Sequence, residues 1–317
     1  QQGLTEYSSE IETPLHALSL FVDSFILDTI VTYTNRQAQS VVHDSWEPID
    51  ECELLAFLGL WVTNAATKNG KCRDSDNWIQ QSPFCLPIYA MAMSRNRYQA
   101  IKRFMRFDDR STRAQRANTQ HIAISETSRT STSRTSTNNN FARGRNDSQL
   151  NSTESQFNEG RNATTIDRLA PIREVFERFN ANCQRAYYPG KFVTVDEQMA
   201  GFRGRCPFRQ YIASKPDKYG MKMWVLCDAR NNYQFNTQPY LGKQSESVER
   251  QQPLRVLLDM VRPLSPGHNV TTDNLFTSVA AAENLHALGH TLVGTMRKNK
   301  PDIPDCFKSA ITATTTV

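Results

Sequence analysis

The chain has 317 residues, of which 38% are hydrophobic, enough to bury one large or two ordinary globular cores. Its formal net charge of +5 is mildly basic, which favours a polyanionic partner without requiring one. No run approaches the roughly 18 consecutive apolar residues of a membrane-spanning helix, and no signal-type segment lies near the start, so we expect no membrane partner.

The seven cysteines are odd in number, scattered along the chain and never arranged as a Cys-x-x-Cys pair. This pattern predicts reduced thiols in an intracellular protein and no zinc site. The chain begins at Gln1 rather than at a methionine, so we expect its true amino terminus to be missing or processed, and whether it is a fragment of a longer protein stays open.

Residues 13–109 carry a helical pattern. Thr13-Pro14 predicts a helix start, and the apolar residues that follow at helical spacing predict one continuous amphipathic helix to about Asn35. A second helix is expected after Pro48. A third is expected over residues 94–107, where a serine supplies the cap.

The third predicted helix interleaves basic and aromatic side chains, and two interpretations of it stay open. Arg95 and Arg97 could contact DNA phosphates. Alternatively, they belong to a solvated basic face above a buried stripe of Tyr98, Ile101 and Met105. Both interpretations place this helix at the surface.

Between residues 113 and 164 the composition changes to serine, threonine, asparagine, glutamine and arginine. Too little apolar surface is present to offset the entropy of ordering, so the sequence predicts a disordered linker or insertion.

The rest of the chain alternates strands and helices in a way that predicts an α/β fold. A helix comes first, followed by three strands with short turns, and then by a helix, a strand, a helix and a final strand. The expected ranges are 165–179, 192–199, 220–227, 233–240, 254–261, 268–273, 278–288 and 291–296. This order is that of an RNase H-like core with a mixed sheet.

Asp196 and Asp273 are the candidate catalytic residues. Asp196 lies on the first predicted strand, and Asp273 ends the fourth, which neighbours the first in such a sheet. Two carboxylates on a rigid sheet are the hard oxygen ligands that phosphodiester chemistry by two Mg²⁺ ions requires. Alternatively, they only cap a strand and a helix, as isolated aspartates usually do. Glu197 alternates to the opposite face, where it would pair with a nearby arginine.

Several blocks of the sequence resemble, in order, the signature of the piggyBac transposases. They are TVDEQMAGFRGRCPFRQY (194–211), SKPDKYGMK (214–222), YLG (240–242), TDNLFTS (272–278) and VGTMRKNK (293–300). The amino-terminal helices resemble the dimerisation and DNA-binding region of that family, to which we assign residues 1–112. The likeness covers nearly the whole chain except the polar segment.

The resemblance implies a DDE/D recombinase that cuts and rejoins double-stranded DNA with Mg²⁺. Asp196 and Asp273 match the first two catalytic, metal-holding aspartates of the family. Basic residues after the first strand would line the DNA path. These are Arg203, Arg205, Arg209, Lys215, Lys218 and Lys222. Residence in the nucleus and a homodimer are further implications, and no small-molecule substrate is expected.

Two departures from the family pattern lead to further expectations. The chain reaches Val317 without the family's third catalytic aspartate or its cysteine-rich zinc module. We therefore expect a truncated RNase H-like core over residues 165–317, weak Mg²⁺ binding and a chain that is inactive by itself. The polar segment stands where the family has a short connection, as a linker or a retained intron. Competing interpretations are a non-catalytic DNA-binding or protein-interaction module derived from a transposase, and a decaying gene copy.

Overall fold

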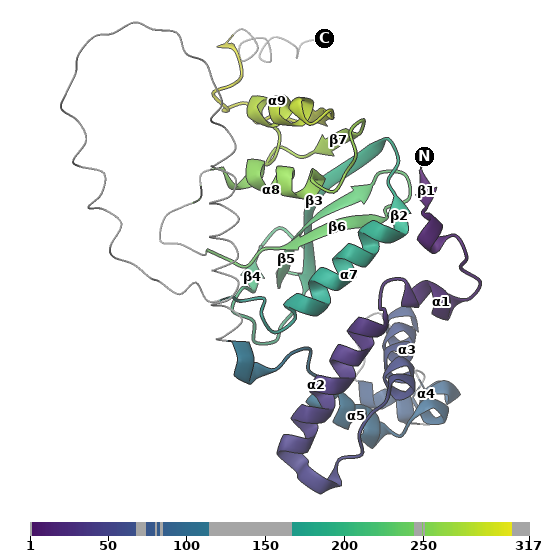
Figure 1. Ribbon diagram of the computed structural model, residues 1–317. Helices are drawn as coiled ribbons and strands as arrows, with labels where there is room; N and C mark the ends of the chain where they lie inside the picture. The colour runs from purple at the N-terminus through teal and green to yellow at the C-terminus, as the bar shows by residue number, and fades with distance from the viewer. Residues whose placement is uncertain are drawn as a thin grey trace, which may run out of the picture. The chain divides into compact units, whose positions relative to one another are not determined.

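The computed structural model describes most of the chain outside the polar segment (Figure 1). The described residues are 2–67, 74–79, 81–82, 85–113, 167–243, 249 and 251–305. Residues 1–108 and 172–317 form one compact unit, and residues 109–171 form a second. The polar segment, apart from Arg113, lies outside the described residues, and the domain boundaries at residues 112 and 164 stay a prediction.

The amino-terminal region is helical, as the sequence predicts. Its α-helices are α1 (Pro14–Ser19), α2 (Ser24–Val42), α3 (Glu51–Thr67), α4 (Pro87–Ala92) and α5 (Arg95–Phe104). Short 3₁₀ turns are η1 (Glu6–Ser8), η2 (His43–Ser45), η3 (Asp74–Trp78) and, in the second unit, η4 (Arg110–Thr112). Within the described residues, no helix is long and apolar enough to cross a membrane.

The prediction of one continuous first helix is wrong. The chain leaves helical geometry after α1, and α2 begins anew because the Asp23 side chain accepts a hydrogen bond from Ile26 N at 3.2 Å as its N-cap. The helix then runs beyond Asn35 to Val42. Asn35 is not a helix end: its side chain accepts from Trp46 Nε1 and Ile49 N, so it holds the following loop.

The helix α5 begins where predicted, because Ser94 Oγ accepts a hydrogen bond from Arg97 N at 3.2 Å. The expected buried stripe is present: Tyr98 and Ile101 are buried, and Met105 packs against the same core. That core also contains Leu54 and Phe57 of α3, both fully buried. The helical region therefore has its own apolar centre.

The remainder of the first unit is an α/β core, with a mixed sheet as predicted. Its strands are β3 (Phe192–Gly201), β4 (Gln210–Tyr211), β5 (Tyr219–Asp228), β6 (Gln234–Pro239), β7 (Asn269–Thr272) and β8 (Thr291–Gly294). Its helices are α7 (Arg173–Ala186), α8 (Gln252–Val261) and α9 (Val279–Ala287). A separate two-stranded sheet joins β1 (Gly3–Leu4) to β2 (Tyr187–Tyr188).

The sheet has the strand order β4-β5-β3-β7-β8, and β6 pairs with the same β5. The pairs β3–β5 and β5–β6 are antiparallel, whereas β3–β7 and β7–β8 are parallel. The first predicted strand, β3, thus lies in the centre of the sheet, beside β7, the fourth predicted strand. This is the RNase H-like arrangement that the element order predicts, and Figure 1 shows α8 and α9 next to β7.

Because side chains alternate along a strand, one face of the sheet is buried and the other carries polar side chains. Val193 and Val195 of β3 and Val270 of β7 are fully buried and share one core with α8 and α9. Residues at the intervening positions, including Asp196, point to the other face. That other face carries the candidate site.

Candidate active site on the sheet

Asp196 of β3 and Asp273, which directly follows β7, lie at the same level of two neighbouring parallel strands. The last paired residues of β3 and β7 are Val195 and Thr272, and each aspartate directly follows one of them. Neighbouring strands lie about 4.8 Å apart, so the two side chains project close together. Both are exposed. The strand register therefore brings the two carboxylates together, as the sequence predicts.

One oxygen of each carboxylate is fixed by the backbone. Asp196 Oδ1 accepts a hydrogen bond from Glu197 N at 2.7 Å, and Asp273 Oδ1 accepts one from Leu275 N at 2.9 Å. The second oxygen of each carboxylate accepts no hydrogen bond from any described residue. These outer oxygens are therefore available to an incoming cation.

The turn after β7 is held by threonines and by a glycine that the sequence interpretation overlooked. Thr277 N and Oγ1 both donate to Asp273 O, and Thr277 Oγ1 lies 2.8 Å from Thr272 Oγ1. A Cβ added to Gly294 of β8 would lie 2.2 Å from Thr277 Oγ1 and 2.6 Å from Thr272 O. Only glycine lets β8 approach the turn this closely, which fixes where Asp273 points.

Cys227 of β5 lies opposite Thr194 and shares the Asp196 face. Burial, and then the negative charge of Asp196, raise the pKa of its thiol. Cys227 is therefore held as the neutral thiol at neutral pH, and it adds no charge beside the carboxylates.

The carboxylates fit part of a divalent-cation site. Two outer carboxylate oxygens on rigid neighbouring strands are suitable ligands for a hard cation. No group of three histidine, cysteine or acidic residues with metal-binding geometry occurs in the described part of the chain. Asp196 and Asp273 would hold the cation together with water or substrate oxygens, as Mg²⁺ sites commonly do.

Glu197 lies on the opposite face, as predicted, but its expected arginine partner is not what the structure contains. Glu197 Oε2 lies 2.5 Å from Lys222 Nζ, and Oε1 lies 3.5 Å from Lys215 Nζ. Burial opposes ionisation of Glu197, yet the hydrogen bonds and charges of the two lysines together lower its pKa below the ordinary value. Two predicted DNA contacts, Lys215 and Lys222, are thus engaged in an internal ion pair.

The other predicted DNA contacts are exposed: Arg203, Arg205 and Arg209 in the basic loop between β3 and β4 (residues 202–209), and Lys218 directly before β5. Arg209 is also structural, because its NH1 donates to Arg203 O and Gly204 O, both at 3.0 Å. The loop is therefore ordered by its own arginine while three other cations point to solvent.

Cations beyond this loop also lie near Asp273. Arg297 Nε donates to Asn274 Oδ1 at 2.8 Å, and Lys300 Nζ donates to Thr277 O. Arg297 and Lys300 lie within the VGTMRKNK block, but the sequence interpretation named neither as a DNA contact. That block could have indicated them, because it begins within β8, the strand paired with β7.

The two candidate arginines of α5 differ. Arg95 is exposed, whereas Arg97 makes a bidentate ion pair with Glu53 of α3, with Nε 2.6 Å from Oε1 and NH2 2.7 Å from Oε2. The Arg97 guanidinium also lies 4.6 Å from the centre of the Trp46 ring. These contacts support the structural interpretation for Arg97 and leave Arg95 available to a partner.

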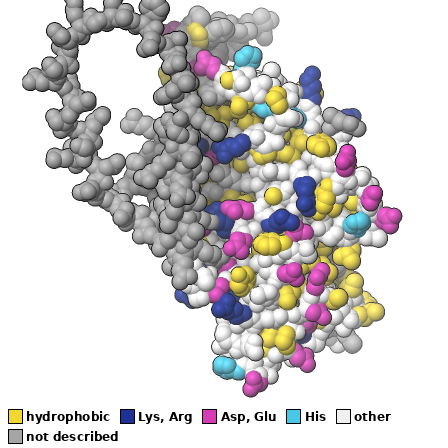
Figure 2. Space-filling model, viewed as in Figure 1, with side chains coloured by type: hydrophobic (Ala, Val, Ile, Leu, Met, Phe, Trp, Pro, Cys, Tyr) yellow, Lys and Arg dark blue, Asp and Glu magenta, His cyan; other side chains and the backbone are white. Residues whose placement is uncertain are grey.

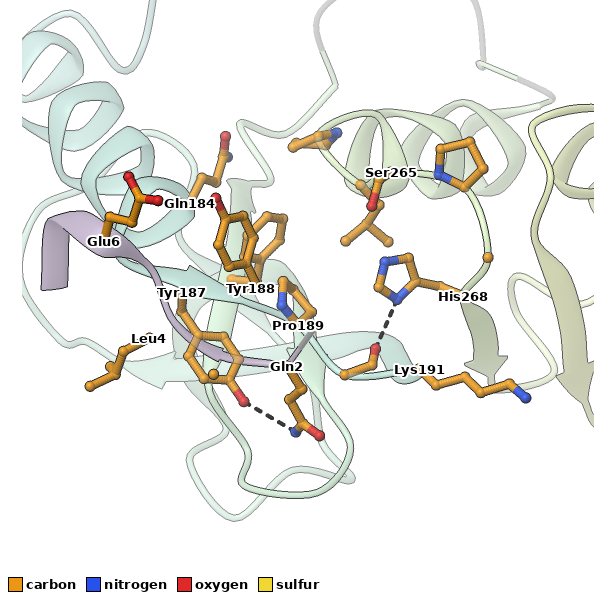
Figure 3. A pocket seen from close by; sticks show the side chains of 17 residues that line it. Gln2, Leu4, Glu6, Gln184, Tyr187, Tyr188, Pro189, Lys191, Ser265 and His268 are labelled. Carbon is orange, nitrogen blue, oxygen red and sulfur yellow. Dashed lines mark hydrogen bonds between the residues drawn. The ribbon is translucent and has the colours of Figure 1, made fainter. Parts of the chain in front are cut away.

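A pocket of about 1110 Å³ lies at the other end of the sheet (Figure 3). It is lined by Lys191 and His268, which precede β3 and β7, and by Gln2 and Tyr187. His268 Nδ1 lies 2.8 Å from Gly190 O, as the dashed line in Figure 3 marks. Because the carboxylates follow the last paired residues of the same strands, this pocket is not part of their site.

Figure 2 shows one side of the molecule, on which lysine and arginine side chains are interspersed with acidic ones. Among the described residues on that side there is no continuous basic stripe of the kind that binds DNA by charge alone.

A protein-family model described as Transposase IS4 matches residues 13–316. The chain belongs to this transposase family. The human PiggyBac transposable element-derived protein 3 is 23% identical over 305 residues, which cover 94% of this chain and 42% of that protein. The human Chimeric ERCC6-PGBD3 protein matches at the same identity, over 23% of its own length.

A solved structure extends this likeness to the fold. It is a cryo-EM structure of a piggyBac transposase synaptic complex with hairpin DNA, 29% identical, with a TM-score of 0.77 over 99% of this chain. These matches confirm the resemblance to piggyBac transposases that the sequence blocks indicated. The present chain spans 57% of the solved piggyBac chain and 42% of the human PiggyBac transposable element-derived protein 3.

Proposed function

We propose that this chain contributes the DNA-binding and catalytic sheet of a piggyBac-type transposase or of a domesticated derivative. The observation that carries the proposal is the placement of Asp196 beside Asp273 on parallel neighbouring strands, each with an outer oxygen available. Family membership and the likeness to a transposase solved with hairpin DNA support it.

In this proposal Asp196 and Asp273 hold Mg²⁺ at the phosphodiester that is to be cut. When bound, the metal supplies activation of the attacking oxygen and stabilisation of the leaving oxygen. The chain's own residues orient the site: Glu197 N–H and Leu275 N–H each hold one carboxylate oxygen, so the other points outward. The Gly294 contact keeps the Asp273 turn in place.

Phosphate contacts in this proposal come from the exposed cations Arg203, Arg205 and Lys218, with Arg297 near the second aspartate. Such contacts position the double-stranded DNA without reading its sequence. Residence in the nucleus and assembly into a homodimer belong to the same proposal, since they rest on the family likeness.

The decisive experiment measures nicking of supercoiled plasmid DNA by the purified chain with Mg²⁺ or Mn²⁺, beside DNA binding over a salt series. Since the sequence predicts weak Mg²⁺ binding and little activity for the chain by itself, we expect slow cation-dependent nicking at most. Asp196→Asn and Asp273→Asn should abolish that nicking, while binding stays within about twofold. Gln198→Ala, an exposed change on the same face, is the matched control and keeps both activities.

Salt-sensitive binding without nicking would overturn the catalytic proposal and favour the competing interpretation, a transposase-derived binding module. Nicking that persists in both aspartate variants would show that a contaminating nuclease, and not this site, cuts the DNA. Absence of any DNA binding would remove the proposal altogether.

A further inference from the structure

Two tyrosine rings stand exposed at the end of the sheet, on short paired strands. Tyr211 of β4 lies directly opposite Tyr219 of β5. The ring centres are 4.8 Å apart, and the side chains are 58% and 46% exposed. Neither hydroxyl hydrogen-bonds to a described residue. Large aromatic side chains without a polar partner normally lie in a core, so this pair calls for an external partner.

The pair shares a face with the candidate carboxylates. On β5, Val225 lies opposite Asp196, and Tyr219 is six residues before it, so both point to the same side. Six residues of strand span about 20 Å. A Cβ added to Gly201 would point to the Glu197 face of β3 and would lie 2.7 Å from Asp217 Oδ2. The Asp217 carboxylate therefore lies on the face opposite to Asp196. A strand of DNA that crosses Asp196 can therefore continue to the tyrosines without meeting the Asp217 carboxylate.

One cation, Arg209, lies beside the rings. Arg209 Cζ lies 5.6 Å from the centre of the Tyr219 ring, and its NH1 is bound to the carbonyls of Arg203 and Gly204. The Phe202 side chain is 37% exposed and lies against Gly204, where a Cβ would meet its ring at 2.5 Å. Aromatic faces interleaved with arginines are the surface that binds single-stranded nucleic acid, by stacking on bases and pairing with phosphates.

We propose that Tyr211 and Tyr219 form a stacking platform for an unpaired nucleobase of the DNA strand that passes over Asp196 and Asp273. Paired DNA presents only base edges and phosphates to a protein, so a ring face gains most from a base that has left the duplex. The inference rests on the proposed function, since it requires DNA on this face of the sheet.

The test uses the full chain, without divalent cation so that no strand is cut, and two DNA probes. One is a blunt duplex. The other is the same duplex with a single-stranded tail of about six nucleotides, a length matched to the strand distance above. The tail carries 2-aminopurine, whose fluorescence falls when it stacks on an aromatic ring. The variants are Tyr211→Ala, Tyr219→Ala and the ring-keeping Tyr219→Phe.

We expect each alanine variant to bind the tailed probe on the order of tenfold more weakly and to lose the quenching, while blunt-duplex affinity changes by less than about twofold. Tyr219→Phe keeps affinity and quenching. Equal loss on both probes, or no loss on either, would overturn the platform.

The inference and the proposed function fail in different ways. If the unmodified chain binds both probes with salt dependence and Arg205→Gln weakens both, but the alanine variants behave like the unmodified chain, only the platform is wrong. If the unmodified chain binds neither probe, the proposed function fails and the platform fails with it.

Discussion

Lys222 Nζ lies 2.5 Å from Glu197 Oε2, on the face of β3 opposite to Asp196. Lys215 approaches the same carboxylate from the segment that follows β4. The side chains of Glu197 and Lys222 are 22% and 19% exposed. An ion pair shielded to this degree fixes geometry better than a surface pair, so Glu197 ties the strand that bears a catalytic candidate to the segment after the basic loop.

The first prediction concerns Glu197→Gln. The pKa of Glu197 is lowered in the folded chain, so the folded state binds fewer protons than the unfolded one around that pKa. Its stabilisation is present above the unfolded pKa of about 4.3 and is lost as the pH falls through the lower folded pKa. We expect the variant to lose about 1 kcal/mol of unfolding free energy near neutral pH, from urea unfolding curves.

That loss should shrink as the pH falls from the unfolded pKa through the lower folded pKa, because the unmodified carboxyl then becomes protonated as well. The matched control is Glu283→Gln in α9, an exposed carboxylate with no ion pair to a described residue. A loss that is the same at every pH would show that the glutamine disturbs packing and that the ion pair contributes nothing.

The central sheet could be predicted because its information is local. Each strand shows its own apolar alternation, and the turn before β6 is marked by Asn231 and by Asn232, which adopts a positive φ of 61°. Once the order of strands and helices is known, few topologies remain, and the position of Asp196 next to Asp273 follows from the topology.

The features that the sequence did not reveal depend on contacts between distant segments. Asp23 is held in place as the N-cap of α2 because Arg178 and Asn182 of α7 donate to its second carboxylate oxygen at 2.6 Å and 3.0 Å. The helical spacing of the apolar residues continues from α1 into α2, so this spacing does not indicate the break between the two helices. The lysine partners of Glu197 and the close approach at Gly294 are likewise products of the folded chain.

The second prediction separates the two arginines of α5. Arg97→Ala removes a bidentate ion pair with Glu53 and the contact with Trp46, so it should lower the unfolding free energy by about 1–3 kcal/mol. Arg95→Ala, two residues away and exposed, should change stability by less than about 0.5 kcal/mol. Thermal unfolding compares the two, and the same loss in both would show that the pair with Glu53 is worth little.

The third prediction concerns Gly294→Ala. The added methyl group would meet Thr277 Oγ1 and Thr272 O well inside normal contact distance, so β8 or the Asp273 turn must shift. We expect a loss of about 1–3 kcal/mol in unfolding free energy, from urea unfolding, and a reduced rate of plasmid nicking. The control is Gly59→Ala in α3, where the new methyl group meets nothing within 4 Å and helix propensity improves. A Gly294→Ala chain as stable as the control would contradict this account.

The fourth prediction follows from the two neighbouring carboxylates. Without a cation, Asp196 and Asp273 repel each other, so replacing one by asparagine removes an unfavourable interaction. Asp273→Asn should therefore melt at the same temperature as the unmodified chain or higher when no divalent cation is present. Adding Mg²⁺ or Mn²⁺ should raise the melting temperature of the unmodified chain, because a ligand that binds only the folded state stabilises it.

Adding Mg²⁺ or Mn²⁺ should leave the melting temperatures of Asp273→Asn and Asp196→Asn unchanged, since each variant retains only one of the two carboxylates. A cation concentration of about 100 times Kd would stabilise the unmodified chain by about 2.7 kcal/mol, a shift that thermal unfolding resolves readily. Gln198→Ala, on the same face, should respond to the cation as the unmodified chain does. If both asparagine variants melt lower without cation and still gain stability from Mg²⁺, the carboxylates are structural and the cation binds elsewhere.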